Sequence, residues 1–424
     1  MATVTREPEV HLPESHPPRR VKFNWVDSFL WAMRVFAIFF FAWGTVGAIA
    51  LSLSGEGLGL AAWQDLIVAA ISQGSMYGLI ALGYSMVYGI LGFINFAHGE
   101  VFMAGSLTGF FVADALATAG LWESSWLIAI FIVLIASMFT STATAVIIER
   151  VAYRRLRNSP RLIPLITSIG VSFFIQNSVL RLTGSATKTY PQMPEWLTEK
   201  YTLLGISFEA TRILVIVIAL IAMAGLWQFV ARSTTGRAIR AVAEDKEIAA
   251  LMGIDVDRTI VMTFAVGGAM AGIAGVLWAI MFRGVSAFTG FIPGIKAFTA
   301  AVLGGIGNIA GAFVGGLVLG LFEGLGPNIV LRGLAWEIPR FIGLIALIAL
   351  AVFGYLAWRN RTRTYGLLAG LFGLIAIASF LGWSFTIPGL SQLKDAVAFT
   401  ALVLVLIFKP TGLLGEQLSA EDRA

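Results

Sequence analysis

Two stretches of the sequence place polar side chains within otherwise apolar runs. The first ends with Asn95, His98 and Glu100. Polar groups at membrane depth are costly unless they are paired or face water. In a helix, Asn95 and His98 would lie three residues apart on one face, where they could hydrogen-bond a polar solute. The alternative is a structural tie between helices. We therefore treat these three residues as candidates for a substrate pathway.

The second stretch, 287–307, contains Lys296 and Thr299 between Pro293 and a cluster of glycines. Proline suits the start of a helix and glycine its end, as expected for a broken membrane helix. We expect the two stretches to be counterparts in an inverted repeat that flank a central pathway, with Lys296 and Thr299 beside it. Lys296 has a simpler alternative, because a lysine can extend its charged end to the membrane interface.

A third stretch, 233–255, predicts one short amphipathic helix outside the bilayer. Ser233 or Thr234 can cap its start and Gly253 can end it. Such a helix can dock into a groove on another protein or lie on the membrane surface. The mixture of glutamate with arginine favours docking. The expected docking residues are Gly236, Arg237, Arg240, Glu244, Glu247 and Gly253, with apolar contacts from Ile239, Val242, Ala243 and Ala250.

Sequence motifs for catalysis are absent. No lysine follows a glycine, so a phosphate-binding loop cannot be completed, and the sequence has neither a GxSxG nor a HExxH motif. There is no cysteine, and there are only three histidines. We see no carboxylate pair within a span. We expect no catalytic residue, no metal site and no cofactor on this chain.

The composition predicts a membrane protein. Of the 424 residues, 58% are hydrophobic and 12% are charged, whereas soluble domains have about 25% charged residues. The net charge of +5 does not indicate nucleic-acid binding, because the basic residues form short clusters between apolar runs. That pattern is typical of a protein that contacts membrane lipid and crosses the bilayer many times.

Apolar runs of roughly 20 residues predict an all-α polytopic transmembrane bundle with about 10–12 membrane segments, including discontinuous helices. An anchor helix is expected at 29–53, within 25–60. The other expected spans are 64–90, 98–118, 125–148, 163–183, 209–231, 259–283, 293–305, 308–326, 338–357, 364–383 and 394–408.

Basic clusters set the predicted orientation. Arginines crowd 150–161, and arginines and a lysine crowd 232–246, so both loops should be cytoplasmic. Alternation through all the spans then places both termini in the cytoplasm and the loop 184–208 on the opposite face, where it can meet an external partner. If 293–305 were re-entrant, the orientation of every later span would be reversed. The charge pattern argues against that alternative.

The run Tyr77–Glu100 closely resembles the high-affinity branched-chain amino acid permease of bacterial ABC importers. The resemblance continues through Glu149–Arg154, Gly236–Asp257, Gly294–Gly307 and Lys409–Gly415. It implies an inner-membrane complex with a second permease subunit, two ATP-binding cassette subunits that hold ATP-Mg, and a periplasmic binding protein that delivers leucine, isoleucine or valine. It also implies that 233–255 is the coupling helix that docks on an ATPase.

Other functions stay open at this point. Permeases for urea or short amides share the segment around Asn95, and an ion-coupled secondary carrier or a structural scaffold are further alternatives. Two regions depart from the family pattern. The expected organisation is a disordered cytoplasmic tail at 1–24, an extra anchor helix at 25–60, a permease core at 61–331, an inserted helical pair at 332–390, and a last helix with a cytoplasmic tail at 391–424.

Overall fold

A computed structural model describes most of the chain. The described residues are 25–53, 58–157, 159–203, 206–331, 340–360, 363–380 and 393–415. The predicted tail 1–24 lies outside them, as do 416–424 and the segments 332–339, 361–362 and 381–392 of the predicted insertion.

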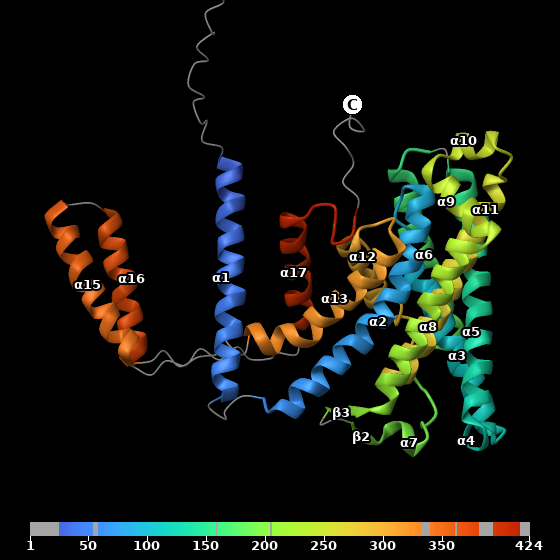
Figure 1. Ribbon diagram of the computed structural model, residues 1–424, viewed down its shortest axis with the longest axis horizontal. Helices are drawn as coiled ribbons and strands as arrows, with labels where there is room; N and C mark the ends of the chain where they lie inside the picture. Colours follow the sequence, from blue (N-terminus) through green and yellow to red (C-terminus); the bar gives the residue numbers. More distant parts are fainter. Residues whose placement is uncertain are drawn as a thin grey trace, which may run out of the picture.

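Long helices dominate the described residues, which confirms the predicted all-α polytopic class (Figure 1). Each predicted span coincides with one of them. The long helices are α1 (Trp25–Leu53), α2 (Leu60–Leu91), α3 (His98–Thr118), α5 (Trp126–Ile148), α6 (Leu162–Thr183), α8 (Ala210–Arg232), α11 (Val256–Phe282), α12 (Phe291–Gly304), α13 (Ile309–Gly326), α15 (Arg340–Asn360), α16 (Arg363–Phe380) and α17 (Lys394–Phe408). Within the described residues seven helices are long and apolar enough to cross a membrane, and shorter apolar stretches of 10–17 residues lie in α1, α12, α15 and α16.

Short elements gather at the two ends of the bundle (Figure 1). One end carries α9 (Thr234–Glu244) and α10 (Lys246–Leu251). The other end carries α4 (Leu121–Ser124), α7 (Glu195–Thr198) and the antiparallel pair β2 (Lys200–Leu203) and β3 (Ile206–Glu209). The remaining elements are β1 (Lys188–Thr189), β4 (Gly284–Val285), the π-helical turns η1 (Glu149–Tyr153) and η3 (Pro327–Leu331), and the 3₁₀ turn η2 (Arg154–Leu156).

The first and last described helices follow the predicted alternation. In Figure 1, α1 begins and α17 ends at the end of the bundle where α9 and α10 lie. This agrees with the alternation of crossings that the basic clusters predict, which places the start of the first helix and the end of the last helix on the same side. That this end faces the cytoplasm stays a prediction.

The helix α12 is a half-helix. Its 14 residues span about 21 Å at 1.5 Å per residue, less than the roughly 30 Å of a hydrocarbon core. The preceding segment begins on the opposite side of the bundle, where β4 pairs with β1. The backbone of 284–290 therefore covers the rest of the distance that α12 does not span. The chain thus crosses the bundle and does not return to the side from which it came.

Small residues allow the central helices to approach closely. The helices α2 and α13 meet along glycines: a Cβ atom added to Gly316 would lie 2.3 Å from the Cα of Gly78, and one added to Gly320 would lie 2.4 Å from the Cα of Gly74. No side chain fits at such distances. Membrane helices lack a hydrophobic driving force between them, and this close backbone packing supplies much of their association.

The two regions that depart from the family pattern contain long helices. The guanidinium of Arg34 on α1 donates to the carbonyl of Ile407 on α17, at 2.9 Å. The helices α15 and α16 pack on each other through stacked Phe353 and Phe372 rings, 5.4 Å apart. This pair lies away from the rest of the bundle (Figure 1).

Candidate functional site

The two breaks predicted from the sequence meet inside the bundle. The helix α2 ends at Gly92, which adopts a left-handed φ of 71°, and α3 restarts six residues later. The backbone at the start of α12 touches this restart: a Cβ atom on Gly290 would lie 2.2 Å from the carbonyl oxygen of Gly99, and one on Gly294 would lie 2.9 Å from the Cα of Gly99. Because these glycines have no side chains, the backbones of the two broken helices come into contact.

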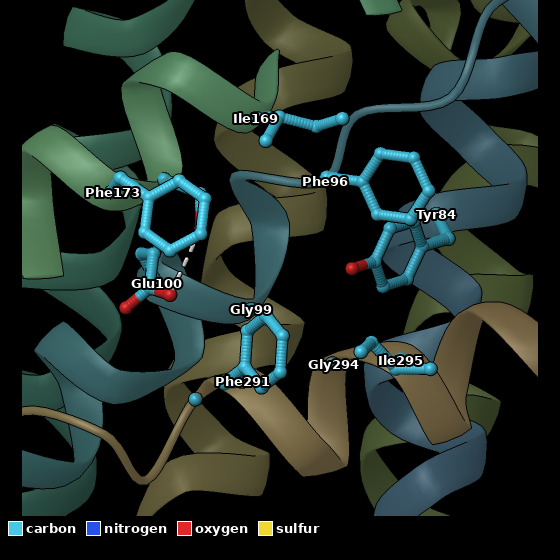
Figure 2. A pocket seen from close by; sticks show the side chains of 11 residues that line it. Tyr84, Phe96, Gly99, Glu100, Ile169, Phe173, Phe291, Gly294 and Ile295 are labelled. Carbon is cyan, nitrogen blue, oxygen red and sulfur yellow. Dashed lines mark hydrogen bonds between the residues drawn. The ribbon is translucent and has the colours of Figure 1, made fainter. Parts of the chain in front are cut away.

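A cavity of about 250 Å³ lies beside this contact (Figure 2). Most of its wall is aromatic, aliphatic or glycine, with a few polar groups, which is the usual composition of a site for a small molecule. Its walls come from α2, the turn before α3, α3 itself, α6 and α12. The lining residues are Tyr84, Phe96, Gly99, Glu100, Ile169, Ser172, Phe173, Gly290, Phe291, Gly294 and Ile295.

Glu100 is the acidic residue of this cavity. Its side chain is buried, and the Ser172 hydroxyl on α6 donates to one carboxylate oxygen, Oε1, at 3.0 Å. The other oxygen, Oε2, is buried without a hydrogen-bond partner. The ring of Phe173 lies on the same side of the cavity as the carboxylate, and the Tyr84 hydroxyl points towards the space between the rings (Figure 2).

Asn95 and His98 lie next to the cavity without lining it. Asn95 precedes α3 in a turn, so the prediction that it shares a helical face with His98 is wrong. Its side-chain oxygen accepts from the Ala97 amide at 3.1 Å and from the Tyr153 hydroxyl at 2.7 Å, because asparagine readily binds nearby backbone where a helix has been interrupted. The His98 ring packs edge-on against Tyr84, with centroids 4.8 Å apart.

Lys296 belongs to a separate buried cluster. Its ammonium lies 2.8 Å from Oε1 of Glu323 on α13 and 2.7 Å from Oδ1 of Asp395 on α17. Gln73 and the Tyr77 hydroxyl also donate to the Glu323 carboxylate, at 2.8 and 3.0 Å. The alternative that Lys296 extends to the interface is therefore wrong.

Two further expectations about this region change. The spans do contain two carboxylates on one partner, Glu323 and Asp395, which sequence spacing did not reveal because they lie on different helices. Thr299 does not line the cavity either; its hydroxyl donates to the Ile295 carbonyl of its own helix at 2.9 Å. Among the residues that the structure describes, no group of three or more His, Cys, Asp or Glu side chains is placed to hold a metal ion.

Comparison with known proteins identifies the family. A family model described as the permease component of a branched-chain amino acid transport system matches residues 66–351. This range includes the cavity, both breaks and the short helices α9 and α10. The chain belongs to this family.

Curated relatives agree with the family match. The permease is 38% identical over 351 residues to the high-affinity branched-chain amino acid transport system permease protein BraD of Pseudomonas aeruginosa, covering 82% of this chain and 94% of the relative. It is 38% identical over 347 residues to the LivH protein of Salmonella typhimurium, with 81% and 93% coverage. A probable LivH of Methanocaldococcus jannaschii is 27% identical over 310 residues, with 70% and 94% coverage. No solved structure matches the permease.

The predicted coupling helix is two helices. Asp245 breaks it with an extended backbone, and its carboxylate accepts from the amides of Glu247 and Ile248 at 2.8 and 2.9 Å, which starts α10. The predicted start and end are confirmed: the Ser233 hydroxyl accepts from the Gly236 amide at 2.8 Å, and Gly253 adopts a φ of 84°.

The apolar residues that this region exposes match the prediction only in part. Ile239 and Val242 are buried in the permease's own core. Ala243 and Ala250 are exposed, as predicted. Larger exposed apolar side chains lie on and just after α10, where Ile248, Leu251 and Met252 are 60%, 86% and 78% exposed. This group is called the α10 patch below.

A network of ion pairs lies at the start of α11. Arg157 forms ion pairs with Glu149 and Asp257, and Arg154 lies 3.1 Å from Asp257. These pairs join η2 and the residue that follows it to η1 and to the start of α11. Partial burial, together with the nearby positive charges of Arg157 and Arg161, lowers the pKa of Lys246 below its usual value.

Proposed function

We propose that this permease carries branched-chain amino acids across the bacterial inner membrane as the membrane-spanning subunit of an ATP-driven importer. Its family and its relatives' names support the transport class and the solute. The observation that carries the proposal is the cavity at the meeting point of two broken helices, since transporters bind their solutes where discontinuous helices face each other.

We propose four kinds of partner: lipid, a second permease subunit, two ATP-binding subunits that hold ATP-Mg, and a periplasmic binding protein. The α10 patch supports docking of an ATP-binding subunit, because exposed apolar side chains outside a membrane indicate an interaction surface. The opposite end of the bundle, with Trp196 and Tyr201 exposed on α7 and β2, is the surface proposed for the binding protein.

The packing offers a route from the docked subunit to the cavity. The helix α9 contacts α2, α8 and α11, and α2 supplies Tyr84 to the cavity wall. ATP binding in the partner is expected to move α9 and α10 together and to shift α2 against its neighbours. Such a rigid-body shift would open the cavity alternately to the two sides.

Reconstitution of the complete importer tests the proposed function. The complex, with its genomic ATPase neighbours and binding protein, is placed in liposomes, and uptake of leucine and urea is measured with and without internal ATP. The expected result is leucine uptake that requires ATP. ATP-independent uptake driven by an ion gradient would support a secondary carrier, and ATP-dependent uptake of urea in place of leucine would support the urea alternative.

Docking has its own test. Leu251→Asp places a charge in the α10 patch and should reduce recovery of the ATP-binding subunit in a pull-down at least tenfold. Tyr201→Asp, an exposed residue at the opposite end of the bundle, is the matched control and should leave recovery unchanged. Equal recovery with both variants would contradict docking on α10.

A further inference from the structure

One carboxylate beside the cavity, that of Glu100, has a hydrogen-bond partner for only one of its two oxygens. Glu100 is 1% exposed, yet only Oε1 has a hydrogen-bond partner, while Oε2 has none. None of the described residues that line the cavity is basic. A buried carboxylate with an unpaired oxygen is costly, and the cost falls when a cation or hydrogen-bond donor reaches it.

We infer that Glu100 is the receptor for the ammonium group of the transported amino acid. This inference rests on the proposed function and specifies how the same cavity recognises its solute. An ammonium has three donors, of which one can bond Oε2. The rings of Phe173 and Tyr84 line the same cavity as the carboxylate (Figure 2).

The start of α12 suits the other end of an amino acid. This helix has no side-chain hydrogen bond at its N-terminus, and its first residues, with Gly290, line the cavity. The positive end of a helix dipole attracts carboxylates. At α12 the attraction comes from this dipole, because Pro293 has no amide N–H and the amides of Phe291 and Gly294 donate to the carbonyls of Phe288 and Gly290. Two helices, α3 and α12, begin beside the cavity. The first turn of α3 already contains the Glu100 carboxylate, so the N-terminus of α12 is the one that can attract the carboxylate of the solute. The cavity thus presents a negative group and a positive one to a zwitterion.

The remaining wall suits a branched aliphatic side chain. Ile169, Phe96 and Ile295 supply apolar surface, and the cavity volume of about 250 Å³ is slightly below the roughly 300–1,000 Å³ usual for drug-sized ligands. That size suits one amino acid better than a peptide. Urea lacks both the charge and the apolar group that this site complements.

The absence of cysteine from the chain makes a protection experiment possible. Ile169→Cys places a single thiol in the cavity wall and leaves the bond between Ser172 and Glu100 intact. In the assembled complex, the rate of modification by a small methanethiosulfonate reagent is measured with leucine, with 4-methylpentanoate, which is leucine without its ammonium, and with neither. Ser185→Cys, exposed in the loop after α6, is the control thiol, whose rate should not respond to either solute.

The inference predicts that leucine slows modification at position 169 and that 4-methylpentanoate does so about tenfold less effectively, as expected for loss of one charged hydrogen bond. Adding Glu100→Gln, which keeps the shape and the acceptor for Ser172, should remove the advantage of leucine. Three outcomes would overturn the inference. They are equal protection by both solutes, unchanged protection by leucine in the Glu100→Gln background, and no protection in a complex that imports leucine with ATP. Failure of the proposed function would instead appear as absence of ATP-driven leucine uptake by the parent complex.

Discussion

Glu100 and Glu323 are both buried glutamates in membrane helices, at 1% and 3% exposure, but their surroundings differ. Both oxygens of Glu323 have partners, supplied by Lys296, Gln73 and Tyr77. Glu100 has a partner for one oxygen only and lies against a cavity. A complete polar network holds helices together, whereas an incomplete one beside a cavity is available to a ligand. We therefore assign Glu323 to stability and Glu100 to recognition.

The largest effect should come from breaking the complete network. Lys296→Met leaves Glu323 and Asp395 without their shared cation, and removal of one partner of a buried ion pair costs about 3–5 kcal/mol. Thermal unfolding of the purified permease, followed by fluorescence-detected gel filtration, should show a clear loss of stability.

A neighbouring lysine provides the control for this variant. Lys394 lies 3.6 Å from the same carboxylate but is 47% exposed at its side chain, so Lys394→Met should cost less than about 1 kcal/mol. If Lys296→Met were as stable as the parent protein, the cluster would not be structural.

A smaller effect is expected where the two broken helices touch. Gly290→Ala places a methyl group against the Gly99 carbonyl and should force α12 away from α3, at about 1–3 kcal/mol, with loss of leucine uptake. Gly170→Ala on α6, where a Cβ atom meets nothing within 4 Å, is the matched control. Normal uptake by Gly290→Ala would show that the close approach is not needed for transport.

The smallest effect should follow loss of the one hydrogen bond to Glu100. Ser172→Ala removes a donor worth about 1 kcal/mol, so leucine uptake should fall roughly fivefold while the protein stays folded. Ser178→Ala removes a hydroxyl that bonds only within α6 and should leave uptake unchanged. A similar fall in both variants would indicate a general effect on α6.

The sequence predicted the helices and the meeting of the two breaks, because apolar length and proline and glycine positions are local signals. Glu100 was named as a pathway candidate because a polar side chain within an apolar run is also a local signal. The sequence did not predict the partners of Lys296, since Glu323 and Asp395 reach that lysine from other helices. Ser172 and Phe173 were also missed, because nothing in the local pattern of α6 distinguishes the face that packs on α3 from the faces that do not.

The turn at Asn95 and the break at Asp245 show a second kind of limit. The side chain of each residue accepts hydrogen bonds from backbone amides that follow it in the chain, and the spacing of apolar residues does not show where these turns lie. The positions of these turns depend on the packing of neighbouring helices, which periodicity does not report.

The most direct test of the account compares Glu100→Gln with Glu323→Gln in one preparation of the reconstituted importer. Uptake of leucine, the ATPase activity stimulated by loaded binding protein, and thermal stability of the permease are measured for both. We predict that Glu100→Gln loses at least about tenfold in uptake and keeps its ATPase activity and stability, while Glu323→Gln loses stability first. Normal leucine uptake by a stable Glu100→Gln complex would contradict the assignment of the cavity as the amino acid's path.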